Sequence, residues 1–174
     1  YNLALLLSEK GKLNESLELY NFIIKLNPNH INAYNNIGLI FLNQSKINTA
    51  IKYFNICLKI NSKFYKAYIN LGIAHKYYGD FKLAEKSFKK AIFLSTNPSE
   101  AYYNLSLIKK INSGDGFIDE LHNLLNNKAL SLKDKFHFYF SIAKALEDTN
   151  NFKESFNFYL EANKICKYLS NYSK

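Results

Sequence analysis

Apolar residues recur along the chain with the spacing of paired helices. Between residues 31 and 64 two apolar stripes follow each other, each with the three- to four-residue spacing of one helix face. A short polar turn over 44–46 separates them. The first stripe contains Tyr34, Ile37, Gly38 and Phe41, and the second contains Ala50, Phe54, Cys57 and Leu58. This pattern predicts two amphipathic helices joined by a tight turn.

The same pattern recurs with a period of 34 residues. Segments 32–38, 66–72 and 100–106 read NAYNNIG, KAYINLG and EAYYNLS. A fixed period of this length is typical of repeat proteins in which helix pairs stack on one another. We therefore expect an all-α fold without strands, a right-handed α-solenoid of about five helix pairs. The predicted repeats are 1–30 (truncated), 31–64, 65–98, 99–135 (divergent) and 136–169.

Small and aromatic residues keep the same period. Small residues recur on first helices at Ala4, Gly38, Gly72, Ser106 and Ala143, and on second helices at Ser16, Ala50, Ala84 and Ser155. A bulky side chain there would push the two helices apart, so we expect close crossings. Aromatic residues recur beside them at Tyr34, Tyr68, Tyr102 and Tyr139, and at Tyr20, Phe54, Phe88 and Tyr159. We expect these rings in the core.

This combination resembles the tetratricopeptide repeat. The third repeat carries the resemblance most completely, with Tyr68, Leu71, Gly72, Gly79, Ala84, Phe88 and Ala91. The resemblance extends over nearly the whole chain. It implies a scaffold module that binds a protein or peptide ligand in the concave groove lined by the first helices.

The fourth repeat departs from the pattern. We expect a first helix over about 99–112, a glycine-containing turn over 113–116 and a helix over about 117–127 without the usual small residue. Ser131, with Asp134 three residues later, predicts the capped start of another helix. Residues 119–164 also resemble the end of the repeat array in bacterial proteins that join tetratricopeptide repeats to a sulfotransferase domain. That resemblance leaves open a second role, as the substrate- or partner-recruiting N-terminal domain of a larger transferase.

The sequence shows no constellation that supports catalysis. Glycine-rich phosphate loops, a nucleophile elbow and the zinc-protease motif are all missing from it. The four histidines, His30, His75, His122 and His137, lack the spacing of metal ligands; His30 is expected in solvent and His75 in helix packing. Acidic neighbours such as Asp119 and Glu120 point in different directions on a helix. We expect no enzyme activity, cofactor or metal in this chain.

Cysteine content and charge indicate the cellular compartment and the kinds of partner to expect. Cys57 and Cys166 form no paired motif, which predicts reduced, mostly buried thiols and a cytoplasmic protein. The net charge of +9 is the balance of 23 lysines and 14 acidic residues. The chain has no arginine, the residue that prefers bidentate phosphate and base contacts. Nucleic acid is therefore not favoured as a partner, and no apolar run is long enough for a membrane span. The chain begins at Tyr1 and is interpreted as a piece of a longer or processed protein; its oligomeric state is not indicated.

One polar series recurs on the predicted first helices, at Asn2, Asn36, Asn70 and Asn104. Because an amide both donates and accepts, stacked asparagines can bind a peptide backbone, and the row resembles the asparagine ladder of O-linked N-acetylglucosamine transferases. The alternative is that these amides bond to neighbouring helices. Apolar residues flank the row at Leu5, Leu39, Ile73 and Leu107, with Tyr1, Ile69 and Tyr103 adjacent. Only Lys66 and Asn36 match the clamp that binds chaperone tails, so this clamp is not favoured.

Overall fold

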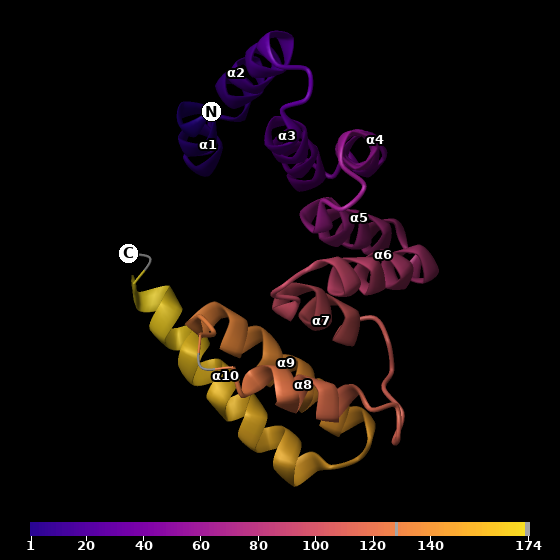
Figure 1. Ribbon diagram of the computed structural model, residues 1–174. Coiled ribbons are helices and arrows are strands. Elements are labelled where there is room, and N and C mark those ends of the chain that lie inside the picture. Colours follow the sequence, from indigo (N-terminus) through magenta and orange to yellow (C-terminus); the bar gives the residue numbers. More distant parts are fainter. Residues whose placement is uncertain (128, 173–174) are drawn as a thin grey trace. The chain divides into compact units, whose positions relative to one another are not determined.

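The computed structural model describes residues 1–127 and 129–172, and within these residues the chain forms ten α-helices and no β-strand (Figure 1). The helices are α1 Asn2–Glu9, α2 Leu13–Leu26, α3 Ile31–Asn43, α4 Ile47–Ile60, α5 Tyr65–Tyr78, α6 Phe81–Leu94, α7 Ser99–Ser106, α8 Phe117–Leu125, α9 Leu132–Asp148 and α10 Phe152–Tyr172. The predicted all-α class is confirmed. The helices fall into two compact units, Tyr1–Leu94 with α1 to α6 and Ser95–Lys174 with α7 to α10.

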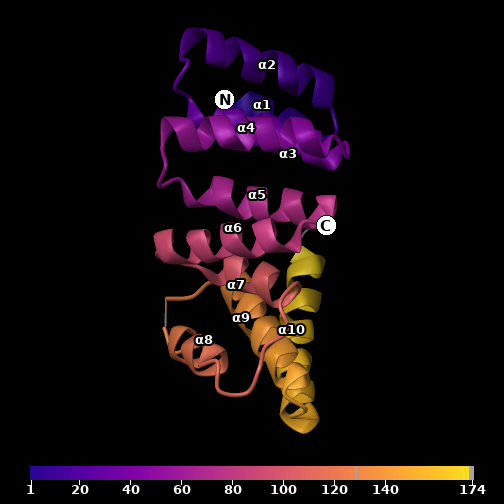
Figure 2. The same ribbon diagram turned by 90° about the vertical axis from the view of Figure 1, so that its right-hand side faces the viewer.

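The first unit consists of three helix pairs, α1 with α2, α3 with α4 and α5 with α6, which pack in sequence through α2 on α3 and α4 on α5 (Figure 2). The turn inside each pair places one residue in the left-handed region. These residues are Gly11, Ser45 and Gly79, with φ of +76°, +60° and +89°. Glycine adopts this conformation without steric cost, and the position recurs with the predicted period.

The helices of each pair cross closely at the small residues, as expected. A Cβ atom built on Gly72 would lie 2.3 Å from Cε1 of Phe88, and one on Gly38 would lie 2.4 Å from Cε1 of Phe54. In the first pair, Ser16 Oγ donates a hydrogen bond of 2.7 Å to the carbonyl oxygen of Ala4. The small residues are therefore required by contact between the two helices of a pair.

The aromatic series forms the core chiefly through the second helices. Tyr20, Phe54 and Phe88 are fully buried, and Tyr102 of α7 is nearly so. Four members are only half-buried, namely Tyr34, Tyr68, Tyr139 and Tyr159. Tyr34, Tyr68 and Tyr139 of first helices, and Tyr159 of α10, thus lie at the edge of the core and keep some accessible surface.

In the second unit α9 is the central helix, because α7, α8 and α10 all pack against it. The predicted start of α9 is confirmed: Ser131 accepts from the Asp134 backbone N–H, and the Asp134 carboxylate accepts from the Ser131 backbone N–H. On α10, Ser155 Oγ donates to the Ala143 carbonyl oxygen at 2.8 Å. The last helix pair therefore repeats the close crossing found between α1 and α2.

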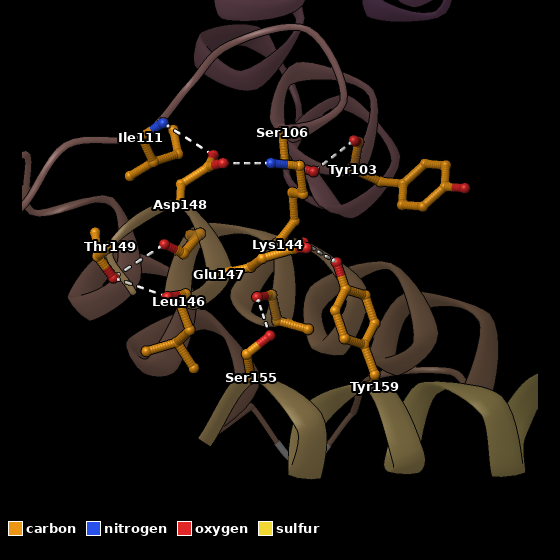
Figure 3. A network of polar contacts seen from close by, with 12 residues as sticks. Tyr103, Ser106, Ile111, Lys144, Leu146, Glu147, Asp148, Thr149, Ser155 and Tyr159 are labelled. Atoms are coloured by element: carbon orange, nitrogen blue, oxygen red, sulfur yellow. Dashed lines mark hydrogen bonds and ion pairs between the residues drawn. The ribbon is translucent and has the colours of Figure 1, made fainter. Parts of the chain in front are cut away.

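The prediction that the first helix of the fourth repeat extends to about residue 112 is wrong, because α7 ends at Ser106. The chain then turns, and the buried Ile111 donates its backbone N–H to Asp148 Oδ2 at 3.1 Å. Lys144 pairs with the other oxygen of Asp148 (Figure 3). This carboxylate at the end of α9 thus binds the backbone of the loop that follows α7.

Candidate functional site

The first-helix face of the first unit, defined here as Asn2, Asn36, Asn70, Leu39, Ile73 and Lys66, is the surface expected from the sequence. Asn36 lies at its centre on α3 and is half-buried. Its amide nitrogen donates to the hydroxyl oxygens of Tyr1 and Tyr20, each at 2.9 Å. Both amide hydrogens are therefore used within the protein, and the carbonyl oxygen is the group left to accept a ligand hydrogen bond.

The other amides of the row also bond within the chain. Asn70 is buried, and its Nδ2 donates to Asn35 Oδ1 at 2.8 Å, which links α5 to α3. In the second unit, Asn104 is buried and its Nδ2 donates to the Glu100 carbonyl oxygen at 2.9 Å in its own helix. Asn2 is exposed. The amides have a structural role in addition to any role in binding, which is the alternative that the sequence left open.

The apolar neighbours of the row are partly accessible. Leu39 and Ile73 are half-buried and pack against the core formed around Phe54 and Leu71. Lys66 is exposed at the start of α5. Leu107 of the second unit is 41% exposed just beyond α7. The first-helix face thus offers apolar surface beside amide oxygens and a cationic side chain.

A serine, a histidine and an aspartate meet in the second unit without the geometry of a catalytic triad. Ser99 Oγ donates to Asp134 Oδ1 at 2.7 Å and lies 3.3 Å from His137 Nδ1. Ser99 is 2% exposed, so a substrate carbonyl has no access to its oxygen. Burial, helped by the nearby charge of Lys133, lowers the pKa of His137 to about 4. These groups connect the starts of α7 and α9.

Two further histidines, His30 and His75, serve capping and packing. His30 caps α3, because its Nδ1 accepts from the Ala33 backbone N–H at 3.2 Å, and its ring lies against Tyr1. It is half-buried, so its expected place in solvent is wrong in part. His75 is half-buried on α5, and burial lowers its pKa. Over residues 1–127 and 129–172, no group of three or more His, Cys, Asp or Glu side chains is placed to hold a metal ion.

The two thiols differ in environment. Cys57 is buried on α4, and burial raises the pKa of its thiol to about 12. Cys166 of α10 is exposed, so the expectation of mostly buried thiols holds for only one of them. In the described part of the chain, none of the helices has the length and apolar character needed to cross a bilayer.

A groove that the sequence analysis missed lies between helices of the first unit, and we call it the α4–α6 groove. It has a volume of about 700 Å³. Its lining residues are Asn55 and Leu58 of α4, Tyr68 and Leu71 of α5, and Leu83, Lys86, Ser87, Lys89, Lys90 and Phe93 of α6. Four positions of α6 at helical spacing, 83, 86, 90 and 93, were the signal in the sequence that could have revealed it.

The stacked helix pairs of the first unit are those of a helical repeat protein, and comparison with protein families agrees. A tetratricopeptide repeat model matches residues 31–64, 65–97 and 136–168, and a second TPR repeat model matches residues 4–45. The chain belongs to the tetratricopeptide repeat family. No curated protein matches its sequence closely.

Solved structures with the same fold include MamA proteins and a peptide-binding example. A crystal structure of MamA superposes with a TM-score of 0.67 and 20% identity, covering 98% of both chains. MamA from Desulfovibrio magneticus RS-1 gives 0.65 and 15% identity over 95% of this chain and 92% of that one. YrrB, described as a TPR protein with an unusual peptide-binding site, gives 0.61 and 19% identity over 94% and 83%. At these identities the likeness establishes the fold alone.

Proposed function

We propose that this chain is a scaffold module that binds a peptide or protein segment along the first-helix face of its first unit. The observation that carries the proposal is that Leu39 and Ile73, one repeat apart, are each partly accessible on the same first-helix face as Asn36. Such a surface offers apolar contact together with polar groups that orient a bound segment. YrrB, a protein with the same fold, is described as having a peptide-binding site, which adds general support.

The hydrogen bonds of the row determine which ligand groups it can recognise. Because Asn36 donates both amide hydrogens to Tyr1 and Tyr20, it offers a ligand only its oxygen. A bound segment would therefore donate its backbone N–H groups to this face. Each such bond contributes about 0.5–1.5 kcal/mol net, whereas micromolar affinity needs about 8 kcal/mol. Hydrogen bonds to this face alone are therefore insufficient, and apolar contacts, those of Leu39 and Ile73 among them, must add to the binding free energy.

The wider row remains part of the proposal. Asn2, Asn70 and Lys66 belong to the same face of the first unit, and Asn104 with Leu107 extends the pattern in the sequence. We also propose that the chain acts by binding rather than by catalysis, in the cytoplasm, with a protein or peptide as its partner. Its five predicted repeats, with an irregular fourth, stay a prediction.

A second candidate function rests on the resemblance of residues 119–164 to arrays that precede sulfotransferase domains. In that case the chain would recruit a substrate or partner for a larger transferase. The coding sequence downstream of Lys174 tests this candidate. A nucleotide-binding strand, loop and helix encoded there supports it, and a stop codon or an unrelated domain refutes it.

The main proposal is tested by selecting peptides from a random display library and measuring their affinity by fluorescence anisotropy. Truncating Leu39 and Ile73 together to alanine should weaken a selected peptide roughly ten-fold or more. Leu160→Ala, which truncates an exposed leucine of α10, is the matched control and should leave the affinity unchanged. Far-ultraviolet circular dichroism confirms that each variant is folded. Equal affinity of the folded double variant and the parent would show that binding lies elsewhere.

A further inference from the structure

The positive charge of the chain is concentrated in one stretch of the first unit. Residues 46–94 contain ten lysines and two acidic residues, a net charge of +8 out of the chain's +9. Residues 1–45 are balanced, with three lysines and three glutamates, and residues 95–174 carry the remaining +1. A surface with a large excess of one sign attracts partners of the opposite sign. Residues 46–94 are therefore the part of the chain that favours a negatively charged partner.

Helix α6 brings part of this charge together with exposed apolar side chains. Leu83, Lys86, Lys90 and Phe93 follow one another at helical spacing and all line the α4–α6 groove. Leu83 is 42% exposed and Phe93 is 80% exposed. The Lys90 amine lies 5.4 Å from the centre of the Phe93 ring. Two lysines are therefore flanked by apolar residues on one accessible helix face.

The charges of this face are largely available to a partner. Lys89 pairs with Glu85 at 2.7 Å. Among the described residues, neither Lys86 nor Lys90 has a carboxylate partner, and both are exposed. Since exposed lysines lose little hydration on forming surface ion pairs, each pair is weak alone, and their combined effect is on encounter rate and specificity.

The α4–α6 groove adds apolar surface to the charged groups of Lys86 and Lys90. Its apolar lining includes Leu58 of α4 and Tyr68 and Leu71 of α5. Tyr68 and Leu58 are half-buried, so each still has surface to cover. At about 700 Å³ the groove is large enough for several side chains of a bound segment.

We propose that the α4–α6 groove binds an acidic protein segment, whose apolar side chains enter the groove while its carboxylates pair with Lys86 and Lys90. Four residues of helix separate the two lysines along α6 by about 6 Å. Acidic residues one turn apart on a helix have the same spacing, and those two apart in an extended strand are separated by about 6.7 Å. An extended segment with alternating acidic and apolar residues thus matches the spacing of the lysines and presents its apolar side chains to the groove.

An acidic protein segment fits this surface better than a nucleic acid or an anionic membrane does. Phosphate backbones would use the lysines but leave the apolar lining at Tyr68 and Leu58 uncovered. The groove is a hollow of about 700 Å³ lined by α4, α5 and α6 together, which suits side chains that project from a protein segment better than a flat membrane surface. The groove also shares no lining residue with the first-helix face, so the failure of one proposal leaves the other standing.

The test uses a fluorescein-labelled synthetic peptide that alternates Asp and Glu with Leu and Phe. Two comparison peptides replace either every acidic residue by Gln or every apolar residue by Ser. The chain should bind the parent peptide, and both comparison peptides should bind at least about ten-fold more weakly. Raising the salt concentration from about 0.1 to 1 M shortens the screening length from about 10 to 3 Å, so it should weaken binding of the parent peptide.

Variants of the chain locate the site. The double change Lys86→Gln with Lys90→Gln, and separately Phe93→Ala, should each weaken the parent peptide roughly five-fold or more. Matched controls are Lys10→Gln with Lys25→Gln, which removes the same charge elsewhere, and Phe22→Ala, which truncates a phenylalanine that is 58% exposed on α2. All these side chains are exposed, so the variants should keep the parent circular dichroism spectrum.

The outcomes separate the possibilities. Loss of binding in the groove variants but not in the controls supports the proposal. Equal loss in both sets shows a general charge effect and overturns it, as does a parent peptide that fails to bind. An oligothymidylate strand or a phosphatidylserine vesicle that binds more tightly than the peptide, with the same dependence on Lys86 and Lys90, also overturns it and assigns the surface to nucleic acid or to lipid.

Discussion

Replacing Gly72 by alanine adds one methyl group where α5 crosses α6. The new Cβ atom would lie 2.3, 2.6 and 2.7 Å from Cε1, Cδ1 and Cζ of Phe88. Phe88 is fully buried, so its ring cannot swing into solvent to relieve the overlap. The two helices must therefore move apart or the ring must leave its preferred rotamer.

Two effects of opposite sign determine the result. Alanine favours the helix over glycine by about 1 kcal/mol. Overpacking a well-packed core costs about 1–3 kcal/mol. With three ring atoms inside the contact distance, we expect the upper part of that range and a net destabilisation of roughly 1–2 kcal/mol. Leucine at the same position should destabilise by roughly 2–4 kcal/mol, because its larger side chain meets the same ring.

The assay is urea unfolding followed by circular dichroism, in a double-mutant cycle with Phe88→Leu. Leucine lacks the Cε1 and Cζ atoms that the new methyl group would meet. In the Phe88→Leu background, Gly72→Ala should therefore be neutral or stabilising, with a coupling energy of at least about 1 kcal/mol. Asn21→Ala, on the exposed surface of α2, is the control for helix propensity and should change stability by no more than about 0.5 kcal/mol.

A Gly72→Ala variant as stable as the parent would refute the reasoning, because it would mean that the helices do not cross tightly at this glycine. The same destabilisation with Phe88 intact and in the Phe88→Leu background would also refute it, since the cost would then have a source other than the ring. Gly38 provides an independent repetition, because its Cβ would lie 2.4 Å from Cε1 of Phe54.

Three further predictions concern the second unit and the thiols. Asp148→Asn should destabilise by about 1–3 kcal/mol, because it removes the ion pair with Lys144 and weakens the hydrogen bond that Ile111 donates. The amide of Ile111 should then exchange faster with deuterium. Burial lowers the pKa of His137 to about 4 from the ordinary histidine value of 6.5. Between these two pH values the unfolded chain binds a proton that the folded chain does not, so the free energy of unfolding should fall as the pH decreases through this window. Urea unfolding at pH 7 and at about pH 4.5 should show a smaller pH dependence for His137→Gln than for the parent. In thiol titration, Cys166 should react at once and Cys57 only on unfolding, and two equally fast thiols would contradict the burial of Cys57.

Local sequence signals predicted most of the fold because they describe contacts between neighbouring helices. The period of 34 residues, the glycines at crossings and the capping pair of Ser131 with Asp134 each concern groups close in sequence or repeated at a fixed interval. The end of α7 at Ser106 escaped prediction, and the loop after it bonds through Ile111 to Asp148, 37 residues away. No local sequence pattern predicts a contact between residues so far apart in the chain.

The candidate sites were less accessible to sequence reasoning. The asparagine row could be recognised from its period, but its bonding could not, since Asn36 donates to Tyr1 and Tyr20 and Asn70 donates to Asn35 across repeats. Whole-chain charge was visible, but the α4–α6 groove requires residues from three helices. The sequence repeat therefore predicts which residues share a helix face. Their hydrogen-bond partners and the grooves between helices depend on tertiary packing, which the repeat does not reveal.

The central claim, binding by the first-helix face, is tested most directly by titrating a selected peptide into the nitrogen-15-labelled chain and following the amide resonances. The account predicts that the largest shifts occur on α3 and α5, around Asn36, Leu39 and Ile73, and that the side-chain amide of Asn36 keeps its protein partners while its neighbours respond. Shifts confined to α9 and α10, or a chain that selects no peptide from the library, would contradict it.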